Sequence, residues 1–204
     1  PYPIPPIGKV NAGIMTLSKS KISEATRVQL PCPFKWPTRV ANLKRCLSIN
    51  RLPIEGSDKE LVIVNLHLEA YDDGDGKKAQ AEMLRKYLQA EADKGNYVIA
   101  GGDFNQTFSG TDTSIIKQFN GTWKPPVLDT DKFDKSWQFL MDTKTASCRS
   151  LDKPLTSLNT NKFQFYIIDG FIVSSNIEVT SLETKQMGFK NTDHNPVVLK
   201  FKLK

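Results

Sequence analysis

The chain has 204 residues, of which 39% are hydrophobic, and no change in composition divides it, so we predict one domain with one sizeable core over residues 1–204. No apolar run approaches the roughly 20 residues that cross a bilayer, and the three cysteines, Cys32, Cys46 and Cys148, have no metal-ligand or redox spacing. The net charge of +6 favours an anionic partner such as a phosphate ester, nucleic acid or lipid headgroup.

The chain begins with a proline-rich stretch that has neither an initiator Met nor a signal-peptide pattern. We predict that residues 1–10 form an extended entry segment that continues from something upstream. Residues 11–18 are predicted to form a short strand. Residues 31–37 read as an irregular loop.

A hairpin is predicted next, because residues 45–54 and 60–68 flank the turn-forming sequence Glu55-Gly56-Ser57-Asp58. Side chains alternate along a strand, so Val62, Val64, Leu66 and Leu68 share one face of the second strand. The other face turns from apolar to polar at its C-terminal end, where His67 stands.

A helix is predicted for residues 76–93, with Asp75 as its N-cap and Gly95 as its C-terminal stop. Its apolar stripe is predicted at Ala79, Met83, Tyr87 and Ala90, with Leu84 and Leu88 beside it. The helix connects the strand before it to an apolar run after it. Such a strand, helix and strand form a crossover unit, which indicates an α/β fold.

The apolar run that follows the helix ends in Gly101 and Gly102 and then presents Asp103 and Asn105. Glycine lets the backbone turn sharply and lets a ligand approach it closely. If the two strands of the crossover are parallel, His67 and Asp103 lie at the same edge of the sheet. Two plainer interpretations stay open, namely that Asp103 caps a turn and that His67 is a half-buried histidine with its hydrogen bonds satisfied.

Residues 106–161 are the least regular part of the sequence, with one short helix predicted for residues 112–119. A connection of this length is more often functional than idle. Four aromatic residues in it could line a substrate cleft or form a small satellite core: Trp123, Phe133, Trp137 and Phe139. We favour the satellite core.

Regular structure is predicted again at residues 163–174, an apolar strand with Asp169 in its middle. A carboxylate is costly to bury unless a cation or a histidine pairs with it. Strands are also predicted at residues 177–185 and 197–203, and Asp193-His194 stands just before the last of them. Both histidines of the chain therefore fall at strand edges beside polar residues, a combination that points to a site.

Four motifs in this order resemble the endonuclease/exonuclease/phosphatase superfamily: Asn65-Leu66-His67-Leu68, Gly102-Asp103-Phe104-Asn105, Ile168-Asp169 and Thr192-Asp193-His194-Asn195-Pro196-Val197. The resemblance runs from about Asn11 to the C-terminus. It implies a four-layer α/β sandwich of two packed mixed sheets flanked by helices, and hydrolysis of phosphate esters with Mg²⁺ or Mn²⁺.

The resemblance also implies roles for individual residues. His194 resembles the histidine that works on the scissile phosphate or its attacking water, and Asp169 the carboxylate that orients that histidine. Asp103 would align or deprotonate the water, and Asn105 would donate hydrogen bonds to a phosphate oxygen.

The remaining site residues are assigned from the same resemblance. Asp193 resembles a metal ligand. His67 looks like the second histidine, near the leaving group. Arg45 occupies about the place of a phosphate-binding arginine, and a solvated basic residue is the alternative interpretation that is almost as good.

The family pattern also has an Asn at the end of its first strand and a metal-binding Glu at the end of its second, and both should precede Gly13. Glu24 cannot replace that Glu, because the segment around it does not resemble a buried strand end. We therefore interpret the chain as the C-terminal part of a longer protein. On this interpretation, the chain alone lacks full metal affinity and full activity, and its partner is the missing N-terminal segment.

The sequence thus predicts a divalent-metal-dependent phosphoesterase whose substrate is a nucleic acid, a phospholipid headgroup or a soluble phosphate ester. The alternative is a non-catalytic phosphate- or partner-binding module that retains the fold. Specificity would lie in loops such as residues 106–161, which carry no diagnostic motif. No transmembrane segment is predicted, and the compartment is left open.

Overall fold

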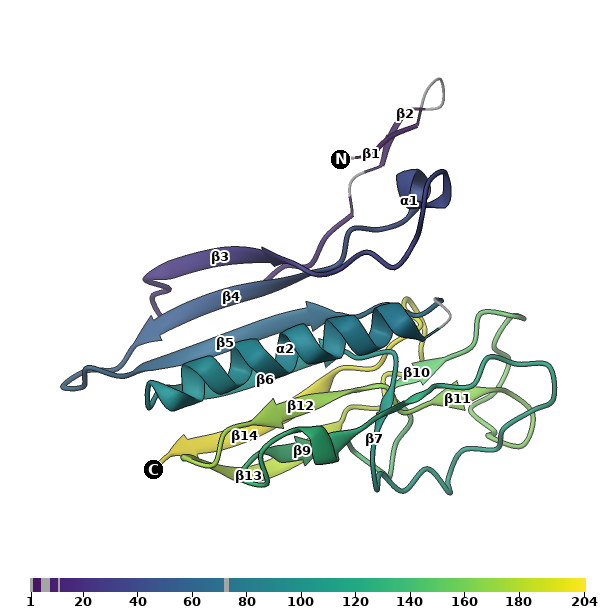
Figure 1. Ribbon diagram of the computed structural model, residues 1–204. Helices are drawn as coiled ribbons and strands as arrows, with labels where there is room; N and C mark the ends of the chain where they lie inside the picture. The colour runs from purple at the N-terminus through teal and green to yellow at the C-terminus, as the bar shows by residue number, and fades with distance from the viewer. Residues whose placement is uncertain (1, 5–7, 11, 72–73) are drawn as a thin grey trace. The chain divides into compact units, whose positions relative to one another are not determined.

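The computed structural model of the protein describes residues 2–4, 8–10, 12–71 and 74–204 (Figure 1). The chain falls into two compact units, Pro1–Ala100 and Gly101–Lys204. The single domain expected from the sequence stays a prediction. Pro1, Asn11 and residues 5–7, on which parts of the predicted entry segment and first strand fall, lie outside the described residues.

The first unit is built around antiparallel strands and one long helix. Its elements are β1 (Tyr2–Ile4), β2 (Gly8–Val10), β3 (Glu24–Gln29), α1 (Thr38–Ala41), β4 (Cys46–Pro53), β5 (Glu60–His67), α2 (Asp75–Asp93) and the start of β6 (Tyr97–Asp103). In this unit β3, β4, β5 and β6 follow one another in the sheet. The described helices include none that is long and apolar enough to cross a membrane.

The predicted hairpin is confirmed, because β4 and β5 pair antiparallel with Leu47 opposite Leu66. The predicted alternation along β5 is also confirmed: Val62, Val64 and Leu66 are buried, whereas the residues between them are only half-buried. Burial of one complete face gives the strand its register, since a slip of one residue would expose all of these side chains.

The predicted helix is confirmed as α2, but two of its details are wrong. The N-cap is Gly74, in a left-handed conformation, and not Asp75. The buried face carries Gln80, Leu84, Leu88 and Glu91, whereas Ala79 and Ala90 are exposed. The polar members of this face have partners: Gln80 hydrogen-bonds the backbone at Glu69 and Pro31, and Glu91 binds Arg51.

One further expectation for the first unit is wrong. The described residues of the predicted strand 11–18 form no strand, and their Met15 carbonyl and Thr16 hydroxyl accept hydrogen bonds from Asn65 Nδ2. Glu24, in contrast, begins β3, which pairs antiparallel with β4. Almost every β3 residue is exposed, so this edge strand has no apolar alternation by which its sequence could be identified.

The second unit consists mainly of short strands. Its elements are the end of β6, then β7 (Thr107–Phe108), β8 (Val127–Leu128), the 3₁₀ helix Thr130–Lys132, β9 (Gln138–Leu140), β10 (Cys148–Arg149), β11 (Phe165–Tyr166), β12 (Asp169–Val173), β13 (Ile177–Thr184) and β14 (Val197–Leu203). In this unit β6, β12 and β9 are neighbours in one sheet. Both strands predicted near the end of the chain are confirmed as β13 and β14, which form a separate antiparallel pair.

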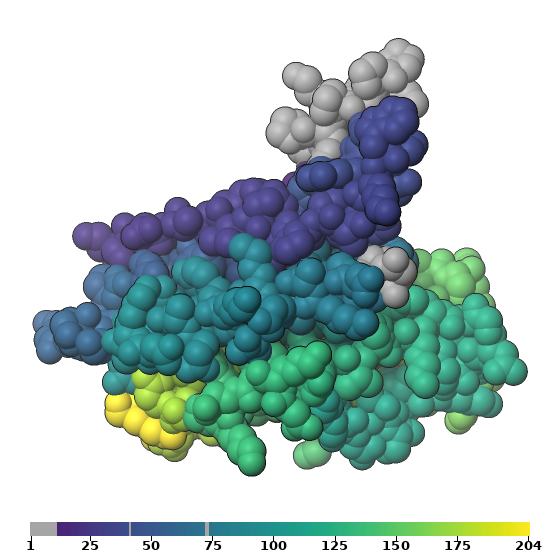
Figure 2. Space-filling model, in the orientation of Figure 1, coloured from purple at the N-terminus to yellow at the C-terminus, as the bar shows by residue number. Residues whose placement is uncertain are grey.

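The long connection at residues 106–161 covers much of the visible surface of the second unit (Figure 2). The helix predicted for residues 112–119 is wrong, because these residues form one short turn within an irregular segment. The predicted satellite core is confirmed for three of its four aromatic residues: Phe133 and Trp137 are buried, and Phe139 stacks edge-on against both Phe108 and Phe133. The fourth, Trp123, instead packs edge-on against Tyr166.

The strand predicted at residues 163–174 is divided into β11 and β12. Asp169 is therefore the first residue of a strand and not its middle. Because a strand end is partly open, the carboxylate avoids the full cost of burial in a core. Gly170 follows directly and packs against the backbone of β9, where a Cβ would lie 2.4 Å from the Leu140 carbonyl oxygen.

Candidate active site

Strand β6 delivers Asp103 at its C-terminal end. The apolar residues before it are buried, and Gly102 has φ +144°, which a residue with a side chain rarely adopts. The Phe104 amide then donates a 3.0 Å hydrogen bond to the Ile168 carbonyl. This bond ties the segment after Asp103 to the one that precedes Asp169.

Asn105, two residues after the end of β6, binds the Asp103 carboxylate through two hydrogen bonds. Its amide nitrogen donates to Asp103 Oδ1 at 2.7 Å, and its Nδ2 donates to Oδ2 at 3.3 Å. Asn105 has φ +51°, a left-handed conformation that Asn tolerates better than most residues. Gly102-Asp103-Phe104-Asn105 thus forms a turn that fixes one carboxylate.

His194 and Asp169 form the closest polar pair of the site. His194 Nδ1 lies 2.8 Å from Asp169 Oδ2, and the ring's Nε2 lies 3.8 Å from Asp103 Oδ2. The hydrogen bond to Asp169 holds the imidazole in one orientation, with Nε2 toward Asp103.

Burial of the His194 ring lowers its pKa, but hydrogen bonds with Asp169 and then Cys148 outweigh this effect and raise the pKa to about 11. The physical cause is the carboxylate, which stabilises the charged imidazolium. At neutral pH the histidine therefore carries a proton that it can donate.

Asp103, Asp169 and His194 could together hold a metal ion, since one donor atom from each lies within 4.8 Å of the others. Carboxylate oxygens suit hard cations such as Mg²⁺, which usually keeps several waters and binds few protein ligands. Asp193, the ligand expected from the sequence, is not a member of this group. Its backbone carbonyl instead accepts a hydrogen bond from the Arg149 amide at 2.9 Å.

His67 and Arg45 belong to the first unit. Both line a pocket of about 250 Å³ whose other walls come from residues 12–14, 43, 44 and 46. The structure thus gathers four of the predicted site residues in the second unit, Asp103, Asn105, Asp169 and His194, and two in the first. A single cleft lined by both groups stays a prediction.

Sequence reasoning missed residues that support this site. The hydroxyl of buried Ser147 accepts hydrogen bonds from the Ile168 and Asp169 amides, both at 3.1 Å. Cys148 forms an isolated antiparallel bridge with His194, and burial raises the pKa of its thiol. Both residues stand in the irregular segment, where neither periodicity nor spacing distinguishes them from loop residues.

The solved structures similar to this chain share a fold. An endonuclease/exonuclease/phosphatase from Beutenbergia cavernae is 14% identical, with a TM-score of 0.57, over 89% of this chain and 45% of that one. The chain has the endonuclease/exonuclease/phosphatase fold. The predicted fold class, an α/β sandwich, is thereby confirmed, with a low helix content.

Two other structures with the endonuclease/exonuclease/phosphatase fold carry more specific names. The human Nocturnin catalytic domain with a bound sulfate anion is 17% identical, with a TM-score of 0.53, over 90% of this chain and 60% of that one. A mannosyl-6-phosphatase from Bacteroides thetaiotaomicron is 17% identical, with a TM-score of 0.51, over 90% of this chain and 67% of that one. This chain therefore spans about half to two-thirds of their lengths. No protein-family model and no curated protein matches the sequence.

Proposed function

We propose that this protein is a phosphoesterase that hydrolyses a phosphate ester with an activated water and a divalent metal ion. The observation that carries the proposal is the hydrogen-bonded Asp169–His194 pair, whose outer nitrogen faces Asp103 at 3.8 Å. A proton donor beside a carboxylate is the arrangement that general acid and base catalysis requires. The endonuclease/exonuclease/phosphatase fold and the net charge of +6 support the same reaction class.

The proposed roles follow from this geometry. His194, held by Asp169, donates a hydrogen bond from Nε2 to a phosphoryl oxygen that gains negative charge in the transition state. Asp103 aligns the attacking water and accepts its proton. Asn105 keeps the Asp103 carboxylate in place through its two hydrogen bonds.

The donor set also fits a divalent cation. Asp103 and Asp169 offer carboxylate oxygens near each other, and we propose Asp193 as a further ligand from the same loop as His194. When bound, Mg²⁺ or Mn²⁺ would polarise a phosphoryl oxygen as a Lewis acid. Both metal ions are included in the proposal.

We also propose that Arg45 and His67, in the first unit, contact the substrate. Arg45 offers a planar fork of N–H donors that suits phosphate oxygens, and His67 is proposed to stand near the leaving group. The substrate is a nucleic acid, a phospholipid headgroup or a soluble phosphate ester. An anionic ester of any of these classes complements the positive charge of the chain.

The test is a panel assay with plasmid and nicked DNA, sphingomyelin, inositol phosphates and sugar phosphates, each with Mg²⁺ and with Mn²⁺. We expect one class to be hydrolysed, and we expect His194→Ala and Asp103→Asn each to lower kcat by about 100-fold or more. Asp112→Asn is the matched control, because Asp112 is exposed and caps a turn in the same unit.

Circular dichroism of each variant shows whether the fold is retained. If the protein hydrolyses none of these esters with either metal, the alternative of a non-catalytic phosphate- or partner-binding module is favoured. Equal losses of activity in the Asp112 and Asp103 variants would remove the proposed role of Asp103.

A further inference from the structure

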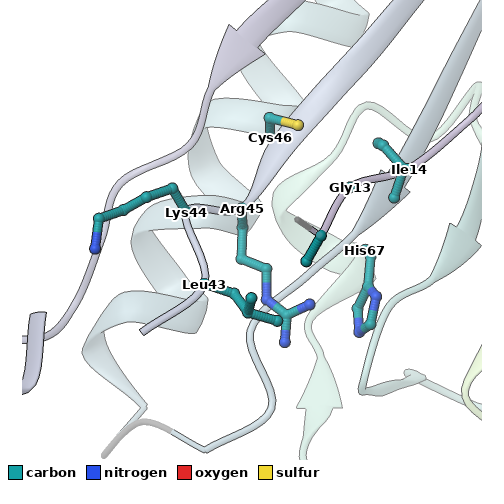
Figure 3. Close-up of a pocket in the computed structure, with 8 residues that line it drawn as sticks. Gly13, Ile14, Leu43, Lys44, Arg45, Cys46 and His67 are labelled. Atoms are coloured by element: carbon teal, nitrogen blue, oxygen red, sulfur yellow. The ribbon is translucent and has the colours of Figure 1, made fainter. Parts of the chain in front are cut away.

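The pocket of the first unit is lined by both basic and apolar residues. In Figure 3 the Arg45 guanidinium and the His67 imidazole extend into the same side of the pocket, with Leu43 and Gly13 beside them. The Lys44 side chain extends away, and its ammonium group donates to the Asn42 carbonyl at 3.1 Å. Arg45 and His67 are therefore the basic groups that the pocket presents.

Arg45 is held in an unusual way for a buried arginine. Its side chain is only 10% exposed, and its Nε lies 3.6 Å from Oε2 of Glu69, whose side chain is 1% exposed. At this distance the pair is an ion pair without a hydrogen bond, and neither of these two atoms has a hydrogen-bond partner. The guanidinium is thus charge-compensated on its Nε edge, while its outer end extends toward the pocket (Figure 3).

Glu69 itself is fixed from several directions. Its Oε1 accepts hydrogen bonds from the Ala70 amide at 3.0 Å and the Tyr71 amide at 3.4 Å. Its own amide donates to Gln80 Oε1 on α2 at 3.0 Å. These contacts leave Oε2 as the atom that faces Arg45, so the carboxylate is an immobile support for the guanidinium.

A second buried pair in the same unit shows what a purely structural ion pair looks like here. Arg51, on β4, binds Glu91 of α2 through hydrogen bonds of 2.7 and 3.1 Å and also binds Glu60. Those bonds occupy both terminal nitrogens of Arg51. Among the described residues, no carboxylate binds the outer end of Arg45 in this way, and that end extends into a pocket.

We propose that Glu69 is a positioning residue: it holds the Arg45 guanidinium so that its outer N–H groups bind a phosphate group in this pocket. The inference rests on the proposed function only in the choice of phosphate as the anion. A buried arginine needs a counter-charge, and a carboxylate fixed on one edge supplies it without occupying the donors that an oxyanion would use. The ordering of the guanidinium is then complete before the anion arrives.

The test measures binding and not turnover, so it can succeed or fail independently of the proposed hydrolysis. The ¹⁵N-labelled chain is titrated with inorganic phosphate while the Arg45 Nε–H resonance, assigned by its loss in Arg45→Lys, is followed. We expect phosphate to shift this resonance, and Glu69→Gln to weaken phosphate binding about tenfold because a charge-assisted contact is lost. Glu91→Gln is the matched control and should lower stability while leaving phosphate affinity unchanged.

Glu69→Asp provides a second measurement if the Gln variant does not fold. The aspartate keeps the negative charge, but its side chain is one methylene shorter, so the carboxylate lies farther from Arg45. We expect weaker phosphate binding by this variant as well, to a smaller extent than in Glu69→Gln. The proposal is overturned if phosphate leaves the Arg45 resonance of the wild-type chain unmoved. It is also overturned if the folded Glu69 variants bind phosphate as tightly as the wild type, or more tightly.

Discussion

His194 Nδ1 and Asp169 Oδ2 are 2.8 Å apart, although 25 residues separate them in the sequence. The contact depends on a short set of main-chain bonds: the Ser147 carbonyl accepts from the Asn195 amide, and the Ser147 hydroxyl accepts from the Asp169 amide. Ser147 thus fixes the backbone on both sides of the pair.

Replacing Asp169 with Asn should lower the pKa of His194 by at least about one unit, because the amide cannot stabilise the imidazolium as a carboxylate does. The chain has only two histidines, so both ring signals can be followed in one NMR titration. Asp142→Asn serves as the control, since Asp142 binds the Thr184 and Lys144 amides. An unchanged His194 pKa in Asp169→Asn would contradict the proposal that the Asp169 carboxylate stabilises the imidazolium.

The same pair should make stability depend on pH in a defined direction. The folded pKa of His194 is raised above the unfolded value near 6.5, so its stabilisation is complete below about pH 6.5 and is lost as pH rises toward about 11. The difference in unfolding free energy between wild type and Asp169→Asn should fall by at most about 1.4 kcal/mol per pH unit in this window. Urea unfolding at about pH 6 and about pH 9 measures it, and a difference that grows with pH contradicts the assignment.

Gly170→Ala should destabilise the second unit by about 1–3 kcal/mol, because the new methyl group would meet the Leu140 carbonyl oxygen at 2.4 Å and the backbone there can move little. Thermal unfolding gives the change in stability. Gly13→Ala is the control, as nothing lies within 4 Å of its Cβ position and its φ is not positive. Equal stabilities for the two variants would show that the β9–β12 contact is looser than described.

Metal binding by the 204-residue chain should be weak, because the cluster offers two carboxylates and Asp169 is already hydrogen-bonded to His194. We expect weak Mg²⁺ binding by isothermal titration calorimetry, because Mg²⁺ gives up its waters reluctantly and this cluster offers few protein ligands. Asp103→Asn should weaken binding further. Tight Mg²⁺ binding by this chain alone would mean that its own residues complete the metal site.

Local sequence patterns predicted much of the secondary structure. The strand at residues 60–68, the helix at residues 76–93 and the final two strands all appear where they were expected. For residues 60–68 the reason is burial of one apolar face, which the alternation in the sequence records. β3 was not predicted, because it is exposed and does not show the apolar pattern by which a strand is identified.

By itself the sequence determined which residue types stand at the strand ends: Asp103 and Asn105 after two glycines, Asp169 near an apolar run, and His194 before the last strand. Only the tertiary structure decided which of them touch. The Asp169–His194 bond, the two bonds from Asn105 to Asp103 and the support of Arg45 by Glu69 depend on distances between strands. Those distances are set by backbone hydrogen bonds and packing between segments far apart in the chain, which no local period encodes.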